Sequence, residues 1–179
     1  PGRPGEDVGR GSPYTQGGRD LLAFVRELGF DGVQLGPQGQ TSPGNASPYD
    51  GSVFSKSVLS IALAELATAR FANVLDAAEV ARAAAEAPPG DTRAHYTYAY
   101  GVQTRALAVA AANLAARDDA PARALKEEIA AFAARATWLA HDARFETFAA
   151  LHGTDDWRTW PAADRDPSPA RSAEVAAEQ

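Results

Sequence analysis

The sequence contains no cysteine and no methionine among its 179 residues. Without cysteine the chain has no disulfide framework, no thiolate metal site and no cysteine nucleophile, which fits the cytoplasmic location that we expect. Because methionine is missing even at position 1, we expect the chain to be a piece of a longer protein. No apolar run approaches the roughly 18 residues of a membrane span, and the N-terminus lacks the apolar segment of a signal peptide. We therefore expect no membrane association.

Positive charge is also scarce, since the net charge is -6 and the pI is about 5.0. Lysine and arginine form no dense run, so we expect no nucleic-acid partner. The phosphate-binding patterns GxxxxGK[ST] and GxGxxG are absent, and so is the nucleophile pattern GxSxG. The histidines form no HxH or HxxxH pair, so we expect neither a metal site nor a cofactor, and we expect each of them on a helix surface. They are His95, His141 and His152.

The composition changes near residue 60. Of the 15 glycines, 12 lie at or before Gly51, whereas 39 of the 41 alanines lie at or after Ala62. Glycine favours turns and alanine favours helices. The sequence therefore predicts a turn-rich first third followed by a mainly helical remainder.

The first third contains one step that is typical of a parallel α/β fold. Asp20–Leu28 has apolar residues at helical spacing and is followed by Gly29, which is a common helix-ending residue. Phe30–Leu35 is apolar and is bounded by glycines, so we interpret it as a strand. A helix, a strand and a Gly/Pro loop together favour the α/β class.

The remainder predicts helices in series. Leu125, Ile129, Phe132, Ala136 and Leu139 form a stripe of core-facing or coiled-coil spacing. Asp76 and Glu79 resemble a capping box. The expected helices cover Ser60–Ala69, Asp76–Ala87 (ended by Pro88-Pro89-Gly90), Asp91–Ala116, a segment opening at Asp119-Ala120-Pro121, Asp142–His152 and the final SAEVAAEQ.

The loop between Gly36 and Ser52 is the main candidate for binding. It has no lysine, arginine or glutamate, and it follows the predicted strand, where parallel α/β folds bind their ligands. Its hydroxyl, amide, phenol and carboxylate groups suit a neutral ligand rich in hydroxyls, with Tyr49 as a stacking platform. An ordinary surface connection is the alternative. The polar candidates are Ser42, Asn45, Ser47, Tyr49 and Asp50.

Aromatic residues are a second candidate for binding. Trp138, Trp157 and Trp160 could stack on sugars, because an indole ring has an apolar face and a polar edge. Packing of the helical part is the alternative for all three.

Two separated segments resemble glycoside hydrolase family 77, the 4-alpha-glucanotransferases. The run GFDGVQLGPQGQTSPGNASPYDGSVFSKSVLSIAL is similar to the family's early barrel segment, in which LGP and SPY are matched by Leu35-Gly36-Pro37 and Ser47-Pro48-Tyr49. Downstream, WLAHDARFETFAALHGTDDWRTWP resembles an aromatic helix followed by W-x-x-W-P, at Trp157, Trp160 and Pro161. The family's aromatic residue a few positions before SPY is replaced here by the Gly44-Asn45 region.

The resemblance implies the first part of a (β/α)8 barrel with an inserted, mainly α-helical subdomain. The implied reaction is transfer of α-1,4-glucan segments between maltooligosaccharides in glycogen or maltodextrin metabolism. The implied substrate contacts are Ser47 and Tyr49, to which we add Asp50. Retaining transfer needs two carboxyl groups. In the family these come from later strands, so we assign no catalytic residue here and expect this chain alone to be inactive.

We expect residues 1–60 to open the barrel and carry the sugar-facing loop, 61–161 to form the helical insertion, and 162–179 to return toward the barrel. Two alternatives stay open. The chain could be a non-catalytic glucan-binding protein, or a helical interaction module that uses the stripe from Leu125 to Leu139.

Overall fold

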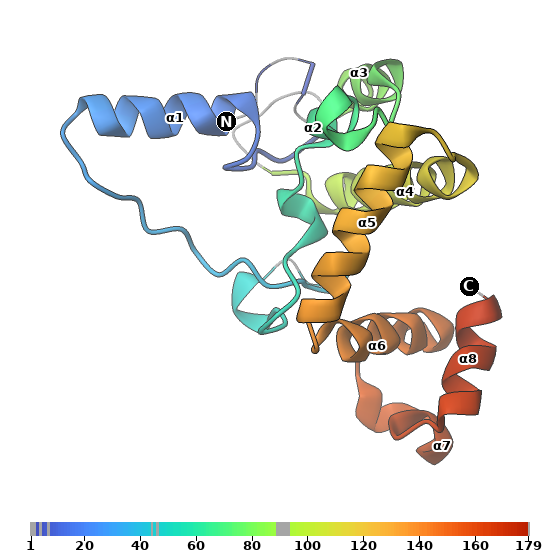
Figure 1. The fold of residues 1–179 in the computed structure, drawn as a ribbon. Coiled ribbons are helices and arrows are strands. Elements are labelled where there is room, and N and C mark those ends of the chain that lie inside the picture. The colour runs from blue at the N-terminus through green and yellow to red at the C-terminus, as the bar shows by residue number, and fades with distance from the viewer. Residues whose placement is uncertain are drawn as a thin grey trace. The chain divides into compact units, whose positions relative to one another are not determined.

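The structure is a computed structural model that describes residues 3, 5–6, 8–43, 45, 47–88 and 94–178. Over these residues the regular elements are helices, and the only β-type pairing is one antiparallel bridge between Gly39 and Lys56 (Figure 1). The mainly helical character is as predicted. The α-helices are α1 (Gln16–Glu27), α2 (Leu63–Leu66), α3 (Ala77–Ala85), α4 (Tyr96–Ala116), α5 (Ala120–Arg135), α6 (Leu139–His152), α7 (Ala162–Arg165) and α8 (Pro169–Glu178).

Short 3-10 turns connect several of these helices. They are η1 (Pro48–Asp50), η2 (Val58–Ser60), η3 (Ala69–Phe71) and η4 (Trp157–Thr159). The chain forms two compact units, Pro1–Ala131 and Phe132–Gln179, which we describe one after the other. None of the helices in the described ranges is long and apolar enough to cross a bilayer.

Helix α1 confirms the first predicted helix but begins four residues earlier. Thr15 caps it, because its side chain accepts a hydrogen bond from the Gly18 N–H. The helix ends as predicted at Gly29, whose φ of +89° lies in the left-handed region that glycine adopts without a steric penalty. A single capping threonine therefore places the start of the helix ahead of its apolar residues.

The predicted strand Phe30–Leu35 is wrong. This segment has no regular structure, and Figure 1 shows it as part of the long connection that leaves α1. A strand needs a hydrogen-bonded neighbour for its backbone groups, and no ladder forms beside this segment in the described residues. Phe30, Val33 and Leu35 are exposed as a result.

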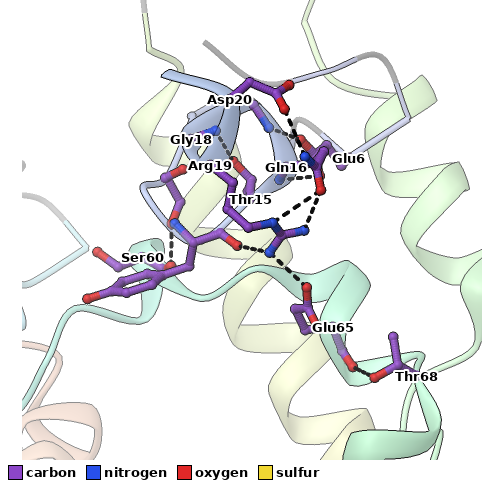
Figure 2. A network of polar contacts seen from close by, with 12 residues as sticks. Glu6, Thr15, Gln16, Gly18, Arg19, Asp20, Ser60, Glu65 and Thr68 are labelled. Atoms are coloured by element: carbon purple, nitrogen blue, oxygen red, sulfur yellow. Dashed lines mark hydrogen bonds and ion pairs between the residues drawn. The ribbon is translucent and has the colours of Figure 1, made fainter. Parts of the chain in front are cut away.

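A polar network ties the N-terminal residues to the segment that enters α2 (Figure 2). Glu6 accepts hydrogen bonds from the Gln16 and Gly17 N–H groups at 3.0 and 2.9 Å, at the positive end of α1. Burial opposes ionisation of Glu6, but these backbone donors outweigh it and hold its pKa below the ordinary value. Arg19 donates to Glu65 at 3.0 Å. The network therefore joins α1 to α2.

Two apolar clusters form the core of the first unit. One joins residues of α2, α3 and α4 to the N-terminal segment, and the other joins the turn after η3 to α4 and α5. Gln103 of α4 donates to the Ile61 carbonyl at 2.9 Å, which fixes α4 against the entry to α2. The cluster residues are Val8, Leu63, Leu75, Val80 and Val102, and then Ala72, Val74, Ala110 and Leu125.

The helices after residue 60 differ from prediction mainly at their ends. The segment Ser60–Ala69 is broken into η2, α2 and η3 rather than forming one helix. Asp76 caps α3 through the Ala78 N–H as expected, but Glu79 pairs with Arg82 within that helix. Helix α4 begins at Tyr96, and residues 89–93, where Pro89-Gly90 was expected to end α3 and Asp91 to begin the next helix, lie outside the described residues.

The stripe from Leu125 to Leu139 does not form one continuous seam. Helix α5 ends at Arg135, and Leu139 belongs to α6. Leu125 and Ala136 are buried, whereas Ile129 and Phe132 are half exposed. Helical spacing alone therefore overestimates the length of the buried face.

The second unit has a core of three residues, Phe148 on α6, Trp160 after η4 and Val175 on α8. Helices α6 and α8 pack on each other, as Figure 1 shows. The Phe148 and Trp160 rings stack with centroids 6.2 Å apart, and Trp160 donates from Nε1 to the Thr154 carbonyl at 3.0 Å. Helix α6 stops as predicted at Gly153, and the predicted C-terminal helix is α8.

Candidate functional site

The loop between Gly36 and Ser57 is closed at its base by backbone hydrogen bonds. Gly39 and Lys56 form the antiparallel bridge. Gln40 donates to the Ser55 carbonyl at 2.9 Å, and Ser52 donates to the Gln40 carbonyl at 2.8 Å. We call this paired segment, residues 38–40 with 52–57, the loop base. These bonds hold the two ends of the loop next to each other.

Two glycines allow the close approach of backbones at the loop base. A Cβ atom at Gly39 would lie 2.2 Å from the Ser52 carbonyl oxygen, and one at Gly51 would lie 3.0 Å from the backbone of Gly39. Distances below 3.0 Å are essentially never tolerated by a real side chain. Close packing therefore requires glycine at position 39, whereas a side chain at position 51 would need a small shift of its neighbour.

The loop carries the three predicted substrate-binding residues on one turn. Ser47 precedes η1, and Tyr49 and Asp50 lie within it, so the three come together within four residues. Pro48 occupies the first turn of η1, where a missing N–H group does no harm. The Tyr49 ring is 83% exposed, Asp50 is exposed and Ser47 is partly buried.

Asn45 organises this turn. Its Oδ1 accepts a hydrogen bond from the Ser47 N–H at 2.9 Å, and its Nδ2 donates to Asp50 Oδ2 at 2.9 Å. Such side-chain bonds replace the backbone pairing that a loop lacks. Asn45 thus bonds one residue on each side of Tyr49, and we described it from sequence only as a possible polar contact. Gly44, predicted to stand where the family has an aromatic residue, lies outside the described residues.

Gln40 is a residue that sequence reasoning missed. Its side chain is 9% exposed, accepts from the Val58 N–H at 2.9 Å and donates to the Thr41 carbonyl at 3.1 Å. Nε2 also lies 3.4 Å from the Tyr100 hydroxyl on α4. No sequence signal marks it, because its burial depends on the way the loop base closes against α4.

The other candidates have structural partners. Trp160 is buried, so the packing interpretation is right for it, whereas Trp157 is 47% exposed with the Arg158 guanidinium 5.4 Å from its ring centre.

His141 is exposed on α6 as expected, but His152 is largely covered and bonds Asp164 at 3.0 Å. No group of three or more metal-ligating side chains occurs in the part of the chain that the structure describes.

These features define a loop that is closed at its base and exposes an aromatic ring, with a hydroxyl and a carboxylate on the same turn. Searches of curated proteins and of solved structures gave no significant match. The family model described as 4-alpha-glucanotransferase matches residues 4–179. The chain therefore belongs to glycoside hydrolase family 77, the family of 4-alpha-glucanotransferases, and the resemblance found in the sequence is confirmed.

Proposed function

We propose that this chain supplies the first part of a 4-alpha-glucanotransferase, an enzyme that moves α-1,4-glucan segments between maltooligosaccharides in cytoplasmic glycogen or maltodextrin metabolism. The family match over residues 4–179 supports this proposal. In the complete enzyme, residues 1–60 would open a (β/α)8 barrel, residues 61–161 would form the helical insertion, and residues 162–179 would lead back to the barrel.

The proposed contribution of this chain is a glucan contact at Tyr49. The carrying observation is the 83% exposure of a ring on a turn that is bonded on both sides. A rigid aromatic ring offers an apolar face to the C–H side of a glucose unit at little entropic cost. Ser47 and Asp50, on the same turn, would hydrogen-bond the hydroxyl groups.

The chain alone is proposed to be catalytically inactive. Retaining transfer requires a nucleophile and an acid/base carboxyl group about 5 to 5.5 Å apart. Within residues 35–54, Asp50 is the only carboxylate, and its Oδ2 already accepts from Asn45. Purified chain incubated with maltotriose should neither release glucose nor form maltooligosaccharides longer than maltotriose. Either product would contradict this proposal.

Binding is the direct test of the glucan contact. Titration of the 179-residue chain with maltoheptaose should show binding that Tyr49→Ala weakens about fivefold or more, because loss of a central aromatic contact commonly costs over about 1 kcal/mol. Tyr14→Ala is the matched control, since Tyr14 is also exposed but lies ahead of α1. Equal affinities of the two variants would refute the contact.

A non-catalytic glucan-binding protein is the second candidate function. The observation that favours it is the same: the loop exposes the Tyr49 side chain but contains only one carboxylate, Asp50, within residues 35–54. Joining the chain to later family strands that carry the catalytic carboxylates should restore transfer if the enzyme proposal is right. The helical interaction module receives no such support, because its stripe is interrupted at Arg135.

A further inference from the structure

We propose that Gln40 is a positioning residue that holds the Tyr49 turn in its binding orientation by locking the loop base onto α4. This inference rests on the proposed function of the loop. Gln40 lies nine residues ahead of Tyr49. Its side-chain hydrogen bonds go to Val58, Thr41 and Tyr100 and not to Tyr49. Its role would therefore be exerted through the backbone.

The first step is the contact between Gln40 and the end of the turn. The Gln40 carbonyl accepts from the Ser52 N–H at 2.8 Å, and Gly51, the residue that follows η1, packs directly on Gly39. Only one residue separates Tyr49 from Gly51. A movement of the backbone at residues 39 and 40 would therefore also move the Tyr49 turn, because these two parts of the backbone are in direct contact.

The second step is the anchor of Gln40 itself. Its amide side chain bonds Val58, Thr41 and Tyr100, so one buried group joins the beginning of the loop, its return segment and α4. A buried amide that loses its partners is costly, which favours one arrangement of the loop base. Helix α4 lies in the predicted helical insertion, so the insertion would determine where the sugar-contacting ring stands.

The physical consequence concerns affinity. A loop that is already ordered pays less conformational entropy when a glucan binds than one that must be ordered on binding. Loosening the loop base should weaken glucan binding without removing any group that touches the sugar. The same change should increase hydrogen exchange in the peptide that covers residues 47–58, while α3 and α6 exchange as before.

The test is a double-mutant cycle on the 179-residue chain, titrated with maltoheptaose. Gln40→Met keeps the side-chain length but removes every donor and acceptor, and it should weaken binding roughly threefold or more. Gln34→Met is the matched control, because Gln34 is exposed ahead of the loop base. In the Tyr49→Ala background, Gln40→Met should have a clearly smaller effect than in the unaltered chain, since a positioning residue acts through the groups that it positions and the main one is then missing.

The outcomes separate this inference from the proposed function. If Tyr49→Ala leaves affinity unchanged, or the unaltered chain does not bind, the glucan contact fails and the inference fails with it. If Tyr49→Ala weakens binding and Gln40→Met does not, or if the two effects simply add, the positioning role alone is overturned. Should Gln40→Met prevent folding, Gln40→Glu keeps the acceptor for Val58 and removes the amide donors, and it is judged by the same cycle.

Discussion

Asp164 is a carboxylate held between two basic side chains in the second unit. It is 5% exposed, and its oxygens contact His152 at 3.0 Å and Arg171 at 2.9 Å. The Arg171 hydrogen bond outweighs burial and, with help from His152, lowers the pKa of Asp164 below its ordinary 3.8. Arg171 also pairs with Glu174 and lies over the Phe148 ring. One acidic side chain therefore links α6, α7 and α8.

This arrangement predicts acid sensitivity of the second unit. Because the folded pKa of Asp164 is depressed, its contribution to stability is fully present above its ordinary 3.8 and is lost as pH falls through the lower folded value. Urea unfolding between pH 7 and pH 3 should show this loss. All three tryptophans, Trp138, Trp157 and Trp160, lie in the second unit, so tryptophan fluorescence reports it selectively.

Asp164→Asn is the variant that checks this prediction. It keeps the shape of the side chain but removes the charge, so the unit should be less stable at pH 7 and should lose part of its acid dependence. Asp156→Asn, at the exposed end of η4, is the control for a general effect of charge removal. A variant with unchanged stability at both pH values would contradict the proposed link.

Thr15 is the second residue with a definite role, since it is buried and caps α1. Thr15→Ala should destabilise α1 by about 1 kcal/mol, as removal of a capping hydroxyl commonly does. Hydrogen exchange of the α1 amides measures this without a fluorescent probe. Thr97→Ala, on the exposed side of the first turn of α4, should leave exchange in α1 unchanged.

At the scale of elements, the loop base depends on the absence of a side chain at one position. Gly39→Ala would place a methyl group against the Ser52 carbonyl, whereas Gly32→Ala meets nothing within 4 Å. We expect the first change to open the loop base and increase hydrogen exchange at residues 52–57, and the second to leave it closed. Similar exchange in both variants would show that the close contact is not needed.

The elements that could be predicted from sequence are those with local stop and start signals. Asp76, Gly29 and Gly153 mark helix ends through their own side chains or backbone freedom, and all three were placed correctly. The strand at Phe30–Leu35 and the loop base could not be derived in this way. Both depend on which distant backbone lies alongside, and a local pattern does not contain that information.

At the scale of the whole molecule, the exposed apolar surface is concentrated early in the chain. Among the described residues, large aliphatic and phenylalanine side chains of α1, the following connection and the loop base are exposed, namely Leu21, Leu22, Phe24, Leu28, Phe30, Val33, Leu35, Val53 and Phe54. Contiguous apolar surface in water favours association. We therefore predict that the chain associates through this part of its surface.

Sedimentation of the purified chain checks that prediction. We expect concentration-dependent association that decreases when Phe24 and Phe30 are both replaced by glutamate. Ile129→Glu is the control, because Ile129 is equally exposed on α5, away from this stretch of sequence. A chain that stays monomeric at all concentrations would refute the expectation.

The family could be recognised from sequence because its motifs are short and contiguous, as Ser47-Pro48-Tyr49 illustrates. The orientation of that motif could not be predicted from the sequence. It depends on the local bonds of Asn45 and also on Gln40, whose side chain bonds Val58 across 18 residues, a separation that no local pattern contains.

Helix α8 completes the small core of the second unit by inserting the fully buried Val175 beside Phe148 and Trp160. Shortening the polypeptide before Pro169 would take away this cover and also Arg171, the guanidinium partner of Asp164. A chain trimmed in that way should be digested by proteases at α6 much faster than its intact counterpart. Helix α8 thus protects the second unit from proteolysis by covering its core.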